Sequence, residues 1–380
     1  MVPGQRPRTG NAAFARRPVA RATLVAIWVA VAAGLAGGAR VMWWYWPGSL
    51  FDGVTSSVWV GLAWDAAHGT FYRPLLGPLG YGGTRYMPVL FLMHALLIRL
   101  DVDPVYAGIA LMQASVVLAA VALYAAQRAA DVPKRLALSL SMTVWGTVVF
   151  QKYCTDVRAD YLAAAFALSS AAVAFGIRHR PRPLRRASLA AALSLLAVLT
   201  KVTALVSIAP IAIWLWIEGR RDLSVRYSLG TLTLLGVAVA LMQAASGGQF
   251  FESFRAAGTA GMVPRDALLA LPKALEEMAV DPPIGIVVAL ACWAVADSCR
   301  RRALGFAHLY FVATLLLTIA LFASPGIVSN QLVDLHLAAV LVVGVALSNG
   351  DRVGRLAVPA FAAVAAVLAV MHSYGYQPLA

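Results

Sequence analysis

Charge is the scarcest property of this sequence. Only 13% of its 380 residues are charged, against about 25% in soluble domains, whereas 61% are hydrophobic. Apolar runs recur as far as the C-terminus, and a soluble fold would have to bury nearly all of them at once. The sequence therefore predicts an all-α polytopic membrane protein, because an isolated span satisfies its backbone hydrogen bonds in lipid only as a helix.

Cysteine is scarce too, and basic residues form no continuous stripe. Cys154, Cys292 and Cys299 are too few and too far apart for a disulfide framework or a zinc site. The net charge of +14 comes from short Lys and Arg clusters between apolar runs, without interleaved aromatic residues. We therefore expect no nucleic-acid partner and interpret the clusters as markers of membrane topology.

The distribution of charge predicts how the chain is threaded. With the N-terminus in the cytoplasm, 21 of the 31 Lys and Arg residues but only five of the 17 acids fall in inner segments, as the positive-inside rule requires. We expect a multi-pass protein of the plasma membrane, with one domain over residues 1–380 and an uncleaved first span. The eleven expected transmembrane helices lie near 22–46, 105–127, 136–151, 161–178, 187–200, 203–217, 227–245, 284–298, 305–323, 331–348 and 356–374.

Three segments are expected to lie outside the bilayer. Residues 1–21 form an Arg-rich cytoplasmic tail, residues 47–104 a first outer loop with surface helices, and residues 246–283 an outer loop with a mobile, Gly-rich start and an amphipathic helix. Within the first loop, the apolar stretch 86–99 is only 14 residues long. At about 1.5 Å per residue it is shorter than a hydrocarbon core of about 30 Å, so we expect an interfacial or re-entrant helix.

Residues 187–217 form a 31-residue, mostly apolar run that is too long for one span and short for two. Lys201 lies near its middle. A helical hairpin that bends at Lys201, at or just below the outer surface, accounts for both facts. Backbone without helical hydrogen bonds is tolerated at such a depth only beside protein or a water-filled cavity.

The first outer loop supplies the leading candidate for catalysis. Asp52 follows the aromatic residues 43–46, which are typical of a helix leaving the bilayer. A carboxylate held there can accept a proton from a hydroxyl nucleophile as a general base. Alternatively, Asp52 only caps the helix that starts near Gly53.

Other polar and ionisable residues gather on the same expected outer side. Such groups are costly near the membrane, which favours a function. Simpler alternatives remain open: the second-loop residues can form a cap and an ion pair, the lysine can reach the surface by snorkelling, and the last pair can satisfy a helix end. The candidates are Tyr72, Arg85, Asp156, Arg158, Asp160, Lys201, Asn330 and Asp334.

Four motifs carry a family resemblance. Asp52 is followed by A-x-x-G-x-x-Y, which ends at Tyr72; then come Arg85-Tyr86-Met87-Pro88, the R-x-D-x-L-A sequence that starts at Arg158, and Lys201-Val202-Thr203. In order and spacing they resemble the GT-C membrane glycosyltransferases, especially members similar to protein mannosyltransferases and lipid-A aminoarabinose transferases. The chain departs from them in lacking an acidic residue directly after Asp52.

The resemblance implies inverting transfer of a hexosyl or pentosyl unit from a polyprenyl-phosphate-linked sugar to an envelope glycan, lipid or protein acceptor on the outer face. It implies Asp52 as the catalytic base and Arg85, Arg158 and Lys201 as ligands of the donor phosphate. No cofactor is certain, and a divalent metal ion stays open. Residues expected to bind substrate or to support the site are Asp156, Asp160, Tyr72, Asn330 and Asp334.

Two other classes of function remain as alternatives. A polytopic transporter or lipid flippase would usually show paired halves with broken helices near the membrane midplane, but the sequence has no internal repeat. A structural membrane subunit would not account for ionisable clusters at four places on one side. The membrane lipids themselves are partners in each case.

Overall fold

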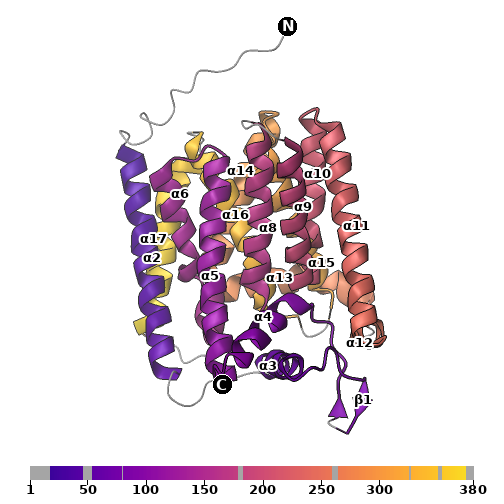
Figure 1. Ribbon diagram of the computed structural model, residues 1–380. Coiled ribbons are helices and arrows are strands. Elements are labelled where there is room, and N and C mark those ends of the chain that lie inside the picture. The colour runs from indigo at the N-terminus through magenta and orange to yellow at the C-terminus, as the bar shows by residue number, and fades with distance from the viewer. Residues whose placement is uncertain are drawn as a thin grey trace.

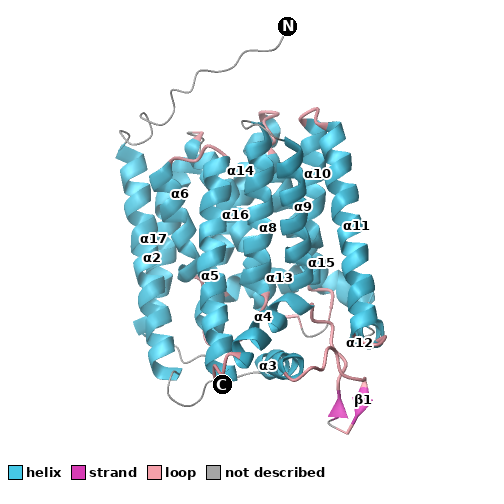
Figure 2. Ribbon diagram, viewed as in Figure 1, coloured by secondary structure: helices cyan, strands magenta, loops and turns pink. Residues whose placement is uncertain are grey.

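The computed structural model describes residues 18–45, 54–78, 80–178, 183–258, 264–324, 327–349 and 353–373. Within these ranges long helices run up and down side by side, and shorter elements gather at one end of the bundle (Figures 1 and 2). Asp52 and most of the N-terminal tail lie outside the described residues. The described part of the chain nearest to the expected base is the helix that begins at Val54.

The bundle consists mainly of helices of 10 to 28 residues that run side by side (Figure 1). Several begin at signals that the sequence carries: α5 starts with Pro104, and the carboxylate of Asp103 accepts hydrogen bonds from the backbone N–H groups of Val105 and Tyr106. These helices are α2 (Pro18–Tyr45), α5 (Pro104–Ala129), α8 (Asp160–Phe175), α9 (Pro183–Thr200), α10 (Ile208–Ile217), α11 (Arg221–Ala245), α14 (Pro282–Arg300), α15 (Phe306–Leu321), α16 (Leu332–Ser348) and α17 (Val353–Ser373).

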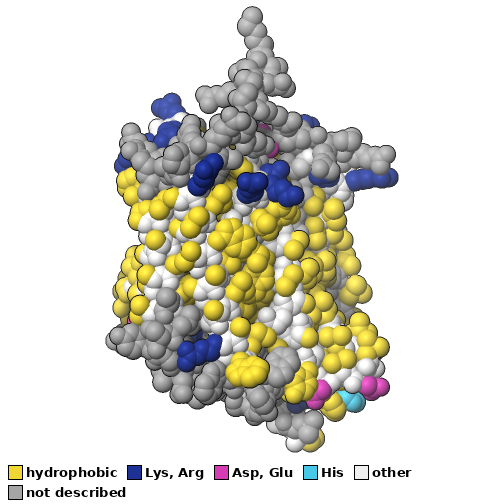
Figure 3. Space-filling model, turned by 90° about the vertical axis from the view of Figure 1, so that its left-hand side faces the viewer, with side chains coloured by type: hydrophobic (Ala, Val, Ile, Leu, Met, Phe, Trp, Pro, Cys, Tyr) yellow, Lys and Arg dark blue, Asp and Glu magenta, His cyan; other side chains and the backbone are white. Residues whose placement is uncertain are grey.

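The outer surface of the bundle is apolar. Helix α11 has a mean hydropathy of 1.7, yet only 11% of it is buried within the protein. Leu229 and Leu232 on this helix are 60% and 57% exposed. Figure 3 shows another face with a broad hydrophobic band, at one end of which several Lys and Arg side chains gather, while the other end carries acidic side chains and fewer Lys and Arg side chains. Lipid is the environment that such a surface requires, so the chain is an all-α membrane protein.

Six helices of the described part are long and apolar enough to cross a bilayer unaided. Other apolar helices are shorter: Asp160–Phe175, Val202–Ile217, Phe306–Leu321 and Leu356–Leu368. The expected count of eleven spans therefore stays a prediction.

The expected span at 136–151 is broken into three pieces: α6 (Lys134–Ser141), the 3₁₀-helix η1 (Met142–Gly146) and α7 (Val148–Tyr153). Helix α2 approaches the break closely, since a Cβ atom on Gly34 of α2 would lie 2.3 Å from the Cα atom of Gly146. The buried carboxylate of Asp281 accepts the backbone N–H of Val149 at 2.7 Å. It thereby satisfies a donor in the first turn of α7.

The hairpin expected in residues 187–217 is observed, with its bend at Lys201. Helix α9 ends at Thr200, Lys201 is extended, and the 3₁₀-helix η3 (Val202–Ser207) leads into α10. The lysine thus lies at an interruption of the helical backbone, where its side chain is free to turn toward the protein interior.

The shorter elements form a layer at the end of the bundle opposite the Lys and Arg side chains (Figures 1 and 3). They include α3 (Val54–Ala67), the antiparallel ribbon of β1 (Leu76–Gly77) and β2 (Gly80–Tyr81), and α4 (Pro88–Arg99). The guanidinium of Arg99 donates to the carbonyl oxygen of Ala67 at 2.9 Å, and it thus fastens α4 to the end of α3. Whether α4 enters the membrane stays a prediction.

The loop at 246–283 contains more helix than expected. Its Gly-rich start continues into α12 (Gln249–Gly258), and the expected amphipathic helix follows as α13 (Pro264–Val280). Helix α12 forms because Ser246 Oγ accepts the N–H of Phe250 and Gln243 Oε1 accepts the N–H of Phe251, both at 3.0 Å. These side chains satisfy donors of the first turn that would otherwise have no partner.

Candidate functional site

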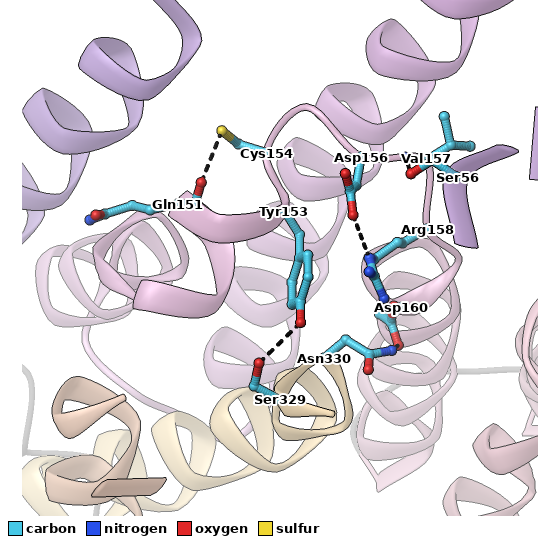
Figure 4. Close-up of polar contacts among 10 residues, drawn as sticks. All are labelled: Ser56, Gln151, Tyr153, Cys154, Asp156, Val157, Arg158, Asp160, Ser329 and Asn330. Carbon is cyan, nitrogen blue, oxygen red and sulfur yellow. Dashed lines mark hydrogen bonds and ion pairs between the residues drawn. The ribbon is translucent and has the colours of Figure 1, made fainter. Parts of the chain in front are cut away.

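Lys201 is the centre of a buried polar cluster. Its ammonium nitrogen Nζ lies 2.7 Å from Asp160 Oδ1 and 3.5 Å from Asp334 Oδ2. The amide of Asn330 donates to the same Asp160 oxygen at 3.0 Å, and Figure 4 shows these two side chains meeting. The side chains of the three charged residues are only 5–17% exposed. The start of α8, the bend after α9 and the start of α16 are thus joined by one charged group.

The charges of this cluster do not balance. One ammonium group lies between two carboxylates, so the three ionised side chains together carry one negative charge. Removing one partner of a buried ion pair costs about 3–5 kcal/mol, because the remaining charge stays buried without compensation. Asp160 is the stronger partner of Lys201, because its contact is shorter by 0.8 Å and its oxygen also accepts the Asn330 amide.

Arg158 is held by a carboxylate and an aromatic ring. Its Nε donates to Asp156 Oδ2 at 3.0 Å, and both side chains are at most 10% exposed. The guanidinium carbon lies 3.9 Å from the centroid of the Tyr153 ring, which is the geometry of a cation–π contact. The Tyr153 hydroxyl lies 3.2 Å from Ser329 Oγ (Figure 4). The arginine is therefore fixed in position and keeps other N–H donors for a ligand.

A cavity of about 280 Å³ connects these groups. It lies where the bundle meets the layer of shorter elements. Its polar wall contains Arg158, Asp160, Lys201 and Asn330, and the opposing residues come from α3 and the segment before α4: Thr55, Trp59, Arg85, Tyr86 and Met87.

Trp59 and Tyr86 stack within this cavity, with ring centroids 4.3 Å apart and an interplanar angle of 19°. Burial raises the pKa of the Tyr86 phenol above its ordinary value. The neighbouring Arg85 is exposed and makes no ion pair with a described residue. It is thus a cation of the cavity that no described carboxylate pairs with.

Three of the predicted site residues lie behind the cavity surface. Asp156 and Asp334 hold Arg158 and Lys201, respectively, from the protein side. Tyr72 is buried among Phe71, Phe91 and Phe250. Its hydroxyl donates to the backbone carbonyl oxygen of Tyr86 at 2.8 Å, and it therefore positions the segment that carries Arg85 and Tyr86.

Among the described residues, no three His, Cys, Asp or Glu side chains group as a metal ion would require. The acids nearest the cavity bond instead to cations, Asp156 to Arg158 and Asp160 to Lys201. The described part of the site therefore does not fit a divalent metal ion.

Sequence reasoning overlooked several residues of the cavity. Gln331 directly follows the predicted Asn330, and Thr203 belongs to the Lys201-Val202-Thr203 motif. Their positions beside predicted site residues could have identified both. Trp59 carried no such signal, because an aromatic residue in an apolar helix is more often part of the core. Its place in the cavity depends on the position of the loop that brings Tyr86 beside it.

Comparisons with known proteins show the fold. No protein-family model and no curated protein matches the sequence. Solved structures do match, among them the archaeal oligosaccharyltransferase AglB from Archaeoglobus fulgidus in complex with an inhibitory peptide and a dolichol-phosphate, and the Archaeoglobus fulgidus oligosaccharyltransferase in complex with Zn and sulfate. Both are 14% identical to this chain, with TM-scores of 0.55 and 0.53.

The matches cover 96% and 94% of this chain but only 53% and 52% of the oligosaccharyltransferase chains. This chain therefore spans about half the length of the proteins it matches. At 14% identity the likeness shows the fold alone: this chain shares the fold of the matched part of these two oligosaccharyltransferases.

Proposed function

We propose that this protein is a membrane glycosyltransferase that transfers a sugar from a polyprenyl-phosphate donor to an acceptor hydroxyl. The observation that carries the proposal is the cavity, which places Arg85, Arg158 and Lys201 around one space in a GT-C fold. The leaving lipid phosphate gains negative charge during transfer, and fixed cations in a site of low dielectric constant stabilise that charge most effectively. One of the similar proteins was solved with a dolichol-phosphate.

The three cations have different roles in this proposal. Arg85 supplies a charge that no described carboxylate neutralises. Arg158 supplies a guanidinium whose plane is fixed by Asp156 and Tyr153. Lys201 keeps its 2.7 Å contact with Asp160 and exchanges the 3.5 Å contact with Asp334 for a phosphate oxygen.

Asp52 is proposed as the general base, although it lies outside the described residues. Helix α3, which begins two residues later at Val54, brings Thr55 and Trp59 into the cavity. A base at the start of this helix would approach an acceptor bound over the same cavity. General-base catalysis is worth about 10²–10⁴-fold in rate. Asp156, Asp160, Tyr72, Asn330 and Asp334 support the cations and the cavity wall.

The cavity is proposed to face the outside of the plasma membrane, with the N-terminus in the cytoplasm. More of the Lys and Arg side chains visible in Figure 3 lie at the end of the bundle remote from α3 and α4 (Figures 1 and 3), and the positive-inside rule assigns such an end to the cytoplasm. The acceptor would then be an envelope glycan, lipid or protein, and the tail of the donor would lie among membrane lipids.

A transfer assay tests the proposal. The full chain, purified in detergent, is incubated with radiolabelled glucosyl, mannosyl and arabinofuranosyl polyprenyl phosphates and with a cell-envelope extract as acceptor. We expect product with one of these donors. Arg85→Gln should reduce its rate by at least about tenfold, as expected for loss of a charged hydrogen bond of about 1.5–3 kcal/mol.

Arg255→Gln is the matched control, because Arg255 is exposed on α12 at the same end of the bundle and does not line the cavity. It should keep the wild-type rate. Equal rates for the Arg85 and Arg255 variants would refute the assignment of Arg85. Transport of the lipid-linked sugar across vesicles without transfer would favour the flippase alternative.

A further inference from the structure

The lining of the cavity differs in chemistry from one element to another. The layer of shorter elements contributes Trp59 and Tyr86, which form a stacked aromatic surface. The bundle contributes Thr203 from η3 and Gln331 from the 3₁₀-helix η4 (Ser329–Gln331), which precedes α16. The cations Arg85 and Arg158 belong to the same cavity. The space is therefore bounded by an aromatic surface, polar uncharged groups and positive charge.

The polar wall contains hydrogen-bonding atoms without partners. Thr203 Oγ1 and Gln331 Oε1 are buried and bond to no atom of the described residues. Buried side-chain polar atoms in proteins nearly always have a partner, so each exception requires an explanation. A hydroxyl can donate and accept, and an amide oxygen accepts two hydrogen bonds. Together they are suited to a ligand that carries several hydroxyl groups.

Thr200 provides an internal comparison, because it also lines the cavity. Its hydroxyl donates to the carbonyl oxygen of Leu196 at 2.7 Å, one turn earlier in α9. This local bond is common for threonine in helices. The bend at Lys201 changes the backbone from α9 to η3, and Thr203, which lies beyond the bend, makes no such bond.

We propose that the wall formed by Thr203 and Gln331, together with the Trp59–Tyr86 stack, is the subsite for the sugar ring of the lipid-linked donor. The inference rests on the function proposed above, and it assigns the uncharged part of the cavity to the sugar. A sugar ring has apolar C–H faces, which pack against aromatic rings, and an edge of hydroxyls. Thr203 Oγ1 and Gln331 Oε1 are buried although both residues line the cavity, so these side chains rotate toward the cavity to bond to the sugar hydroxyls. The phosphate remains with Arg85, Arg158 and Lys201, which have no role in recognising the sugar.

Binding measurements separate the sugar from the phosphate. Purified full-length protein in nanodiscs is titrated with undecaprenyl phosphate and with its glucosyl, mannosyl and arabinofuranosyl derivatives. For each glycosyl derivative, the dissociation constant of undecaprenyl phosphate is divided by that of the derivative. This ratio isolates the contribution of the sugar to binding. Thr203→Val and Gln331→Met should each reduce this ratio by about 2–10-fold, the value of one net hydrogen bond, without changing the affinity for the sugar-free lipid.

Controls fix the interpretation. Thr200→Val should leave the ratio unchanged because its hydroxyl is already bonded within α9, and Thr203→Ser should retain the ratio because it keeps the hydroxyl. Arg85→Gln should weaken binding of both lipids alike. Comparable thermal stability of Thr203→Val and Thr203→Ser shows that folding is not the cause of a difference between them.

The outcomes distinguish this inference from the proposed function. If wild type binds both kinds of lipid but Thr203→Val and Gln331→Met leave the ratio unchanged, the subsite is wrong while the donor assignment stands. If these variants weaken binding of the sugar-free lipid equally, the residues support the fold and the subsite is also wrong. If wild type binds neither kind of lipid, the proposed function fails and the subsite fails with it.

Discussion

The strongest stability prediction concerns the unequal partners of Lys201. Its ammonium contacts Asp160 at 2.7 Å and Asp334 at 3.5 Å, and the three side chains carry one excess negative charge. Asp334→Asn removes the weaker contact and also the excess charge, so the free energy of unfolding should stay within about 1 kcal/mol of the wild-type value. Asp160→Asn removes the stronger contact and should cost about 3 kcal/mol.

Lys201→Met should be the most damaging single change of the three. It leaves Asp160 and Asp334 buried without their cation, at a cost of about 3–5 kcal/mol. Neutralising all three residues together, as Lys201→Met with Asp160→Asn and Asp334→Asn, should recover most of that loss because no buried charge remains. The size of the recovery measures how much of the loss was electrostatic.

The assay is the free energy of unfolding of each purified variant, measured in bicelles by steric trapping. The prediction is an order of stability: wild type and Asp334→Asn highest, Asp160→Asn lower, Lys201→Met lowest. Equal losses for Asp334→Asn and Asp160→Asn would refute the unequal pairing. A triple variant no more stable than Lys201→Met would refute the electrostatic explanation.

Two further substitutions test other parts of the account. Asp52→Asn keeps helix capping, because Asn caps about as well as Asp, but it should reduce transfer by about 10²–10⁴-fold; a wild-type rate in the radiolabel assay would eliminate Asp52 as the base. Gly34→Ala places a Cβ atom 2.3 Å from Gly146 Cα and should cost about 1–3 kcal/mol of stability. Gly61→Ala, which meets no atom within 4 Å, is its control and should be neutral or stabilising.

The helical bundle and the break at Lys201 could be predicted from the sequence because their signals are local. Long apolar runs imply helices in lipid, and a lysine in the middle of a 31-residue apolar run has to lie at an interruption or an interface. The candidates Arg85, Arg158, Asp160, Lys201 and Asn330 were also chosen from local sequence, and the structure brings them to one cavity. Their proposed roles stay predictions.

Other features depend on contacts between distant segments and could not be predicted. The break in residues 134–153 lies where Gly34 approaches Gly146 and where Asp281 accepts the N–H of Val149, which is 132 positions away. The unequal pairing of Lys201 with Asp160 and Asp334 depends on which carboxylates the fold brings to the ammonium group. The order of residues in the sequence does not contain that information. Helix α12 is different, because Ser246 and Gln243, which accept N–H groups of its first turn, lie just before it in the sequence. The prediction of a mobile, Gly-rich loop did not take these two side chains into account.

The central claim is that the cavity between the bundle and the layer of α3 and α4 binds the phosphate of a lipid-linked donor. The most direct measurement is photocrosslinking of the purified full chain with a polyprenyl phosphate that carries a diazirine beside the phosphate, followed by mass spectrometry of the peptides. The account predicts labelling of peptides that contain Arg85–Met87, Arg158–Asp160 or Lys201–Thr203, and competition by unlabelled polyprenyl phosphate. Labelling confined to the lipid-facing surface of α11, or unaffected by the competitor, would contradict it.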